Sequence, residues 1–357
     1  MNLLHFVYAK VWGGGEQYVY SLCKEEVKRG HQNFIIIDPK QKQMIEKFTQ
    51  VATVLPVSLQ KLYKFISIKK ILGIIDKYNI DILNCHSGTM APISATVKML
   101  RPSIKLVIYK HNASKNHRDL YHRWIQKKAD AFVCVSKLVQ QLQTQTACPK
   151  YANKFHLIYN GIDTQRFIQR ARVLPTGTLK IGYAGRIVEN KGLLVLLEAV
   201  KILREKYQLP CSLSIAASSQ SDFKEKCQEF VNQNKLNDVY HFLPNVKDMG
   251  QFYDNIDVFV LPSLIPEAFG LVLCEAMYSA LPVVSSNNGA QREIIENGVN
   301  GILLPPNDAV AIAKSIKELS RDAEKYQQIS LAACKRVEEK FTLKVMVNQL
   351  NQLFSSL

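Results

Sequence analysis

Residues 261–293 read LPSLIPEAFGLVLCEAMYSALPVVSSNNGAQRE, and this stretch decides how the rest of the chain is interpreted. An apolar run that ends at Pro262 and Ser263 predicts a buried parallel strand. The segment 268–280 that follows has the length and apolar content of a helix, which Pro282 stops. The sequence therefore predicts a turn from a buried strand into a helix.

Two glutamates frame this turn, Glu267 in the expected loop and Glu275 two turns into the expected helix. Both carboxylates could then face one ligand across the helix N-terminus. Phe269, Gly270 and Leu271 would offer backbone N–H groups there, where anions are attracted, and Gly270 lets a ligand approach the backbone. The helix N-terminus would bind a phosphate, and the two carboxylates would accept hydrogen bonds from hydroxyl groups. The expected ligand therefore carries a phosphate beside a polyol.

A simpler interpretation makes Glu267 only a favourable charge near a helix start and Glu275 only a solvated position. For Glu275 its neighbours argue otherwise, since the other residues of 271–277 are nearly all apolar. A carboxylate in such a helix is costly unless it has a partner. We therefore expect Glu275 to be paired.

The composition is that of a soluble globular protein: 357 residues, 47% hydrophobic and 21% charged, are enough for two domains. Eight cysteines without a C-x-x-C pair predict buried free thiols and a reducing compartment. The first ten residues lack a basic region and lead into a strand, so we expect no signal peptide. Glu275 and Pro282 interrupt the longest apolar stretch, so we expect no transmembrane helix and a cytoplasmic location.

The net charge of +16 lies entirely in the first half of the chain. Residues 1–170 hold 26 Lys and Arg against 10 Asp and Glu, and residues 171–357 hold 20 of each. The first half therefore faces something anionic, either nucleic acid or a membrane surface. Two basic segments, 59–78 and 101–128, combine cations with apolar or aromatic residues. Each is equally compatible with a membrane-facing helix and with a helix packed on a sheet with solvated lysines.

The first half alternates short apolar runs with helical patterns, which predicts a doubly wound α/β domain. Strands are expected at 3–8, 33–38, 52–55, 81–86, 105–110 and 131–136. Gly13, Gly14 and Gly15 separate the first strand from a helix, a weak phosphate-binding signal because neither dinucleotide fingerprint nor Walker lysine is present. His86 and His111 follow strand ends, where open α/β sheets bind ligands, and His111 is the stronger candidate.

A second unit of the same kind follows a linker expected at 160–178. Strand 179–184, loop 185–192 and helix 193–206 begin it. Arg186 and Lys191 flank the helix start, so two cations and a helix dipole could converge on one diphosphate; the alternative is a solvated basic loop. Further strands are expected at 212–216, 240–243, 258–261 and 283–285, with a short helix opening at Glu293.

Taken in order along the chain, these motifs resemble those of the retaining glycosyltransferases of family four. The residues that carry the resemblance are 13–16, His111, 160–163, 185–192, 267–275 and 289–293. The resemblance implies the GT-B fold, in which two Rossmann-like domains face each other across a cleft. It divides the chain into an acceptor-binding domain (1–165), a nucleotide-sugar-binding domain (166–340) and a terminal helix crossing back to the first domain (341–357). It implies no metal and no cofactor.

The same resemblance gives roles to the candidate residues of the second domain. Arg186 and Lys191 would hold the donor diphosphate and stabilise the leaving nucleotide. Glu267 would contact hydroxyls of the transferred sugar, and Glu275 the ribose of the nucleotide. In the first domain Gly14 and Gly15 would offer backbone donors, and His111 would contact the sugar near the reacting carbon.

The expected activity is retaining transfer of a sugar from a UDP-sugar to a membrane-associated glycan, such as a lipopolysaccharide core or a polyprenyl-diphosphate-linked oligosaccharide. The expected location is the inner face of the cytoplasmic membrane, reached through the basic first half. A sugar-nucleotide epimerase on a similar fold is the enzymatic alternative. A nucleic-acid-binding protein would explain the charge but not the glutamate pair, and the sequence contains no recognisable reading helix or aromatic RNA platform, so no nucleic-acid partner is expected.

Overall fold

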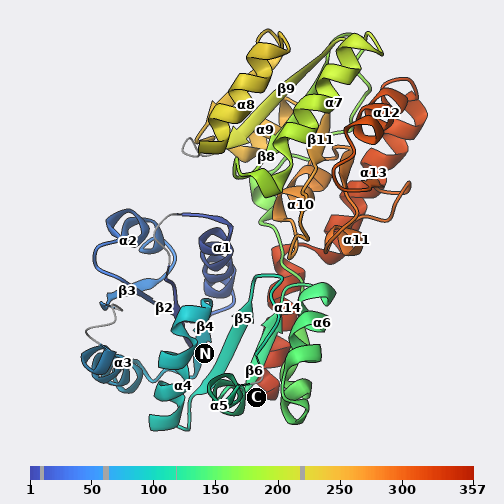
Figure 1. Cartoon of the computed structure of the whole chain (residues 1–357). Coiled ribbons are helices and arrows are strands. Elements are labelled where there is room, and N and C mark those ends of the chain that lie inside the picture. The colour runs from blue at the N-terminus through green and yellow to red at the C-terminus, as the bar shows by residue number, and fades with distance from the viewer. Residues whose placement is uncertain (9–11, 59–63, 118, 218–221) are drawn as a thin grey trace. The chain divides into compact units, whose positions relative to one another are not determined.

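The computed structural model describes residues 1–8, 12–58, 64–117, 119–217 and 222–357 (Figure 1). The chain divides into two compact units, residues 1–161 with 343–357, and residues 162–342. These borders lie close to the predicted ones at 165/166 and 340/341. Parts of the basic segment 59–78, and Arg118 in the second basic segment, lie outside the described residues.

The first unit is built on a parallel sheet flanked by helices. Within its described residues the strand order is β3-β2-β1-β4-β5-β6-β7, and every pairing is parallel. The chain reverses direction across the sheet between β1 and β4, where doubly wound folds place their ligand crevice. The strands are β1 (Asn2–Phe6), β2 (Gln32–Ile37), β3 (Thr53–Pro56), β4 (Ile82–Cys85), β5 (Lys105–Lys110), β6 (Ala131–Cys134) and β7 (Phe155–Leu157).

The helices of the first unit join these strands, and the last helix of the chain packs with them. They are α1 (Gly14–Lys28), α2 (Lys42–Phe48), α3 (Lys64–Tyr78), α4 (Ala91–Leu100), α5 (Leu120–Lys128), α6 (Lys137–Thr146) and α14 (Leu343–Ser356). Figure 1 shows α14, in red, among the blue and green elements of this unit. Its buried side chains Val347 and Leu350 share a core with Leu22 of α1 because the apolar face of α14 repeats at helical spacing.

The second unit repeats the design on a smaller parallel sheet. The described strands follow the order β10-β9-β8-β11-β12-β13. Their bounds are β8 (Leu179–Ala184), β9 (Cys211–Ala217), β10 (Tyr240–Pro244), β11 (Val258–Leu261), β12 (Val283–Ser286) and β13 (Ile302–Leu304). The helices are α7 (Leu193–Glu205), α8 (Asp222–Gln233), α9 (Met249–Asp254), α10 (Leu271–Tyr278), α11 (Gln291–Ile294), α12 (Ala309–Leu319) and α13 (Ala323–Lys340).

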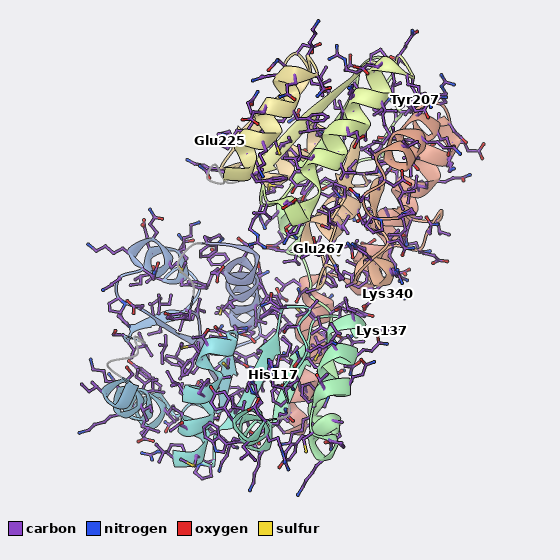
Figure 2. The ribbon with its side chains drawn as sticks, viewed as in Figure 1. His117, Lys137, Tyr207, Glu225, Glu267 and Lys340 are labelled. Carbon is purple, nitrogen blue, oxygen red and sulfur yellow. The ribbon has the colours of Figure 1, made fainter. Side chains whose placement is uncertain are left out.

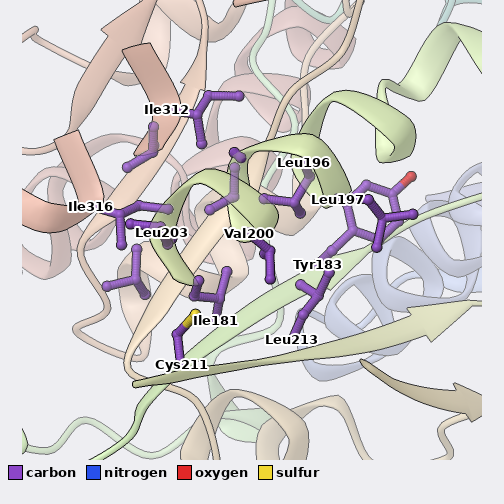
Figure 3. Close-up of a cluster of buried hydrophobic side chains, with 14 of the residues drawn as sticks. Ile181, Tyr183, Leu196, Leu197, Val200, Leu203, Cys211, Leu213, Ile312 and Ile316 are labelled. Carbon is purple, nitrogen blue, oxygen red and sulfur yellow. The ribbon is translucent and has the colours of Figure 1, made fainter. Parts of the chain in front are cut away.

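The core of the second unit explains why α7 lies on the sheet. Leu196, Val200 and Leu203 recur at helical spacing and are wholly or almost wholly buried. Figure 3 shows them between the strand residue Ile181 on one side and Ile316 of α12 on the other. This packing fixes the start of α7, and with it the loop that carries Lys191.

The sequence predicts the starts of two helices, and with one of them the position of Glu275, incorrectly. Helix α10 begins at Leu271 rather than 268, because Gly270 has φ +115°, outside the helical region. Glu275 therefore lies one turn into the helix, not two. The short helix predicted to open at Glu293 is α11, which begins two residues earlier at Gln291.

Other sequence expectations are confirmed. All eight cysteines belong to the described residues and are free, and six of them are buried. Among the described helices, none has the length and apolar content needed to cross a bilayer.

Candidate active site

An ion pair joins two loops at the carboxyl-end edge of the second sheet. Glu267 lies between β11 and α10 (Figure 2), and its Oε1 atom is 2.5 Å from Nζ of Lys191, which ends the short 3-10 helix Glu189–Lys191 after β8. The hydroxyl of Ser263 donates to the same oxygen. Because β8 and β11 are neighbours, the sheet itself brings these two loops together. The Lys191 and Glu267 side chains are only 18% and 14% exposed, so water screens their attraction weakly.

A glycine makes this close approach possible. Gly192 has φ +72°, and a Cβ atom there would lie 2.0 Å from the carbonyl oxygen of Pro262. Beside it, the backbone N–H of Leu264 donates to the carbonyl of Asn190 at 2.9 Å. No side chain larger than hydrogen fits between the loops at this point. The position of Lys191 is therefore fixed by backbone contacts as well as by charge.

A third loop, after β12, closes on Glu267 from the other side. The N–H of Ala290 donates to the carbonyl of Glu267 at 3.0 Å, and Asn288 donates from its side chain to the carbonyl of Ser263 at 3.0 Å. A Cβ atom on Gly289 would lie 2.4 Å from the backbone nitrogen of Glu267. Loops from three neighbouring strands thus converge on Glu267: Lys191 and Ser263 contact its carboxylate, and the loop after β12 contacts its backbone.

Glu275 has the partners that its apolar surroundings require. The hydroxyl of Tyr253 donates to its Oε2 at 2.9 Å, and Nη1 of Arg166 lies 3.9 Å from its Oε1. Burial raises the pKa of Glu275, while Arg166 and the hydrogen bond from Tyr253 act in the opposite direction. The expectation that Glu275 is paired is confirmed.

The Arg186 guanidinium and the backbone N–H of Leu271 at the start of α10 are available to donate hydrogen bonds to a ligand. The Arg186 side chain is exposed, and its guanidinium makes no ion pair with any residue that the structure describes. Gly270 precedes α10 without a capping side chain, so the first-turn N–H of Leu271 is not capped by the helix itself. Phe269 is buried. The convergence of Arg186 and Lys191 on one anion stays a prediction, because in the structure Lys191 is engaged by Glu267.

The candidate residues of the first unit lie at helix and strand ends. Gly14 and Gly15 form the exposed first turn of α1, whose N–H groups have no acceptor within the helix. The preceding N–H of Gly13 donates to the Glu16 carboxylate at 2.9 Å. His111 follows β5 directly, as predicted from the sequence.

His86, which follows β4, lies next to His111. The distance from Nδ1 of His86 to Nε2 of His111 is 3.4 Å. The ring of Tyr18 meets the His111 ring edge-on with centroids 4.9 Å apart. Burial lowers the pKa of His111 to about 4, so its imidazole is neutral at physiological pH.

Comparison with known families decides the relationship. The model named "Glycosyltransferase Family 4" matches residues 12–166, and the model named "Glycosyl transferases group 1" matches residues 164–336. The chain belongs to glycosyltransferase family 4. The two models meet at residues 164–166, a few residues after the second structural unit begins at 162, so each unit corresponds largely to one of them.

Individual relatives agree with this family-4 membership. The amylovoran biosynthesis glycosyltransferase of Erwinia amylovora is 29% identical over 285 residues, which are 76% of this chain and 68% of that protein. A glycosyltransferase structure from Rickettsia africae aligns with a TM-score of 0.86 at 22% identity, over 99% of this chain and 98% of the other. The Anabaena protein HepE in complex with UDP aligns with a TM-score of 0.84 at 21% identity, over the whole of both chains. The GT-B fold predicted from the sequence is confirmed.

Several residues of this family-4 glycosyltransferase site escaped sequence reasoning. Tyr253 and Arg166 contact Glu275 from α9 and from the segment before β8, and their spacing in the sequence carries no signal. Ser263 could have been suspected because it lies just beyond the carboxyl end of β11, where open α/β sheets bind ligands. His5, the buried histidine of β1, was hidden inside an apolar strand.

Proposed function

We propose that this family-4 glycosyltransferase transfers a sugar from a UDP-sugar to a membrane-associated glycan, with retention of the anomeric configuration. The observation that carries the proposal is the Lys191–Glu267 pair, held where three strand-end loops of the group 1 unit converge. The HepE structure in complex with UDP supports a uridine nucleotide as the carrier.

The basic residues supply the charge that a departing diphosphate needs. Arg186 has no ion-pair partner among the described residues, and Lys191 can turn from Glu267 towards a phosphate oxygen. Each charge-assisted contact contributes about 1.5–3 kcal/mol. With two such cations we propose that the reaction proceeds without a metal ion.

The acidic residues bind hydroxyl groups at two separate places. Glu267, relieved of Lys191 by the diphosphate, keeps the Ser263 hydroxyl and accepts hydrogen bonds from the transferred sugar. Glu275, fixed by Tyr253, accepts from the ribose. The different partners of the two carboxylates support different roles, although the sequence motif presents them as a pair.

For the first unit we propose that Gly14 and Gly15 donate backbone N–H groups to the donor phosphate, and that His111 contacts the sugar. A neutral imidazole suits a hydrogen bond to an uncharged hydroxyl or ring oxygen. We assign no catalytic base.

The acceptor is proposed to be a lipid-linked glycan, such as a lipopolysaccharide core or a polyprenyl-diphosphate-linked oligosaccharide, reached at the inner face of the cytoplasmic membrane. The Erwinia relative is named for amylovoran biosynthesis, which supports a polysaccharide pathway. The basic excess of the first half supports an anionic surface. Exposed residues of two helices suit such a surface: Ile66, Lys69 and Lys70 on α3, and Leu120, Tyr121, Arg123 and Lys127 on α5.

A thermal-shift screen against nucleotide-sugars, followed by a transfer assay with the stabilising donor, tests the proposal. A ligand at 100 times its dissociation constant stabilises the folded state by about 2.7 kcal/mol. We expect stabilisation by a UDP-sugar, and transfer that persists in EDTA. Conversion of the donor to an epimer in the absence of acceptor would instead identify an epimerase. Absence of stabilisation by every nucleotide-sugar would contradict the proposed donor class.

A further inference from the structure

Three histidines form a row that runs from the core of the first unit to the edge of its sheet. His5 in β1, His86 after β4 and His111 after β5 come from three neighbouring strands. Nδ1 of His5 lies 3.1 Å from Nε2 of His86, and Nδ1 of His86 lies 3.4 Å from Nε2 of His111. His5 is fully buried, whereas His86 and His111 are partly exposed. The row therefore connects a buried group to a proposed sugar contact.

The buried end of the row is a carboxylate. Glu26 of α1 is wholly buried, and its Oε2 lies 3.5 Å from Nε2 of His5. Within the described part of the chain, neither carboxylate oxygen of Glu26 accepts a hydrogen bond. A buried carboxylate without hydrogen bonds needs a cation beside it. His5 is placed to be that cation.

The environment of His5 favours the imidazolium form. Burial alone lowers the pKa of His5, but its buried neighbours outweigh this effect and raise the pKa overall. Burial raises the pKa of the Cys23 thiol, so at neutral pH the charge beside His5 is that of Glu26. The same Nε2 atom lies 3.1 Å from Oδ1 of Asn33, an acceptor that requires a proton on this nitrogen. The Asn33 amide is itself oriented by donating to the carbonyl of Cys23 at 3.1 Å. A nitrogen that donates to Asn33 has no lone pair for a metal ion.

A charged His5 sets the direction of every proton in the row. Both nitrogens of an imidazolium carry protons, so Nδ1 of His5 donates to Nε2 of His86. A neutral His86 then has its single proton on Nδ1, from which it donates to Nε2 of His111. His111, whose Nε2 accepts, must hold its own proton on Nδ1. With a neutral His5 protonated only on Nε2, every one of these assignments would be reversed.

Aromatic rings hold the row in line. The ring of Tyr109 stacks on His86 with centroids 4.2 Å apart, and Tyr18 packs edge-on against His111. Burial lowers the pKa of both His86 and His111, so neither competes with His5 for the charge. The charge of Glu26 therefore determines which ring nitrogen of His111 carries the proton.

We propose that Glu26 and His5 are positioning residues that fix His111 in its Nδ1–H tautomer, so that His111 presents a hydrogen-bond donor to an oxygen atom of the sugar. This inference rests on the proposed function for the contact of His111 with the sugar. The tautomer itself can be measured without any substrate. A donor at Nδ1 cannot take a proton from an acceptor hydroxyl, which agrees with assigning no base to His111.

The test is two-bond ¹H–¹⁵N spectroscopy of the full-length protein labelled with ¹⁵N-histidine at neutral pH, with signals assigned by single histidine substitutions. The wild-type protein should show imidazolium signals for His5 and the Nδ1–H pattern for His86 and His111. Glu26→Gln should make His5 neutral and move His86 and His111 to the Nε2–H pattern. The control is Glu25→Gln, which removes the neighbouring surface partner of Lys28 and Arg29 and should leave all three patterns unchanged.

A neutral His5, or an Nε2–H His111, in the wild-type protein would overturn the inference even if Glu26→Gln failed to fold. Added Zn²⁺ should leave the His5 signals unchanged, and their loss would identify the cluster as a metal site instead.

Transfer kinetics give a separate measurement. Glu26→Gln should lower kcat about 10- to 100-fold, the effect of losing the proposed hydrogen bond from His111 to the sugar. The KM for the donor should change little. Glu25→Gln should keep wild-type kinetics. A switched tautomer with unchanged kcat would overturn the positioning role in transfer. Absence of transfer by the wild-type protein would count against the proposed function and not against the tautomer assignment.

Discussion

The ammonium nitrogen of Lys191 lies 2.5 Å from Oε1 of Glu267, so a cation and an acid proposed to bind opposite parts of the donor neutralise each other. A diphosphate must draw Lys191 away from Glu267 or share it. Removing either partner leaves the other one poorly solvated and unpaired. Arg186, which is exposed and has no ion-pair partner among the described residues, is consequently the cleaner probe of diphosphate binding.

Arg186→Ala should weaken donor binding about 10- to 100-fold, as expected for one charge-assisted contact of about 1.5–3 kcal/mol. The fold should be unaffected because the side chain is exposed. Calorimetric titration with a UDP-sugar measures the change, and Lys335→Ala on α13 is the control for loss of an exposed cation from the same unit. Equal affinity in wild type and Arg186→Ala would remove Arg186 from the site.

Glu275 should make stability depend on pH. Its pKa in the folded protein is raised above the ordinary value of 4.5, chiefly by burial, so the folded state holds this proton more tightly than the unfolded state. The contribution of Glu275 to stability is therefore present in acid and is lost as pH rises from about 4.5 through the raised pKa. Denaturant unfolding of the wild type and Glu275→Gln across this range should show the mutant gaining relative stability as pH rises; a constant difference would refute the shift.

Gly192→Ala should destabilise the second unit by about 2 kcal/mol or more. The substitution forces an alanine into φ +72° and places its Cβ atom 2.0 Å from the Pro262 carbonyl oxygen. Gly73→Ala on α3 is the matched control, because a Cβ atom there meets nothing within 4 Å. In a helix this change should stabilise by about 0.5–1 kcal/mol. Urea unfolding measures the change in unfolding free energy of both variants. Similar changes would show that position 192 has room for a Cβ atom beside the Pro262 carbonyl.

Charge reversal on the first unit should weaken binding to anionic vesicles. Lys69 and Lys70 on α3, and Arg123 and Lys127 on α5, are exposed, and near an anionic surface each contributes about 1 kcal/mol. Co-sedimentation of the double Glu variants should therefore decrease, and wild-type binding should fall with added salt. Reversal of Lys335 and Lys340 on α13 is the control. Equal binding of the wild-type protein to neutral vesicles would leave the basic half as a solvated face or an acceptor site.

The fold could be predicted largely from alternating apolar runs, because parallel strands buried on both faces are nearly continuous in apolar residues. Strands β5, β8 and β11 have the bounds that the sequence predicts. The sequence predicts a start for α10 that is three residues too early, because apolar content does not reveal the positive φ of Gly270.

The contacts of the candidate site were harder to predict. The partners of Glu267 and Glu275 lie far from them in the sequence: Lys191 ends a short 3-10 helix after β8, and Tyr253 lies in α9. A local sequence pattern could therefore not pair Lys191 with Glu267 or Tyr253 with Glu275. The role of His5 could not be predicted, because nothing in an apolar strand sequence distinguishes it from a core residue. Its contact with His86 depends on the register between β1 and β4.

Binding of free UDP and of the intact UDP-sugar to wild type, Glu267→Gln and Glu275→Gln tests the proposed donor site most directly. If Glu275 holds the ribose and Glu267 the sugar, Glu275→Gln should lose affinity for both ligands. Glu267→Gln should bind UDP at least as tightly as the wild type, because the diphosphate no longer competes with Glu267 for Lys191. It should bind the intact donor less well and abolish transfer. Failure of the wild type to bind either ligand, or loss of UDP affinity in Glu267→Gln as great as in Glu275→Gln, would contradict this division of the site.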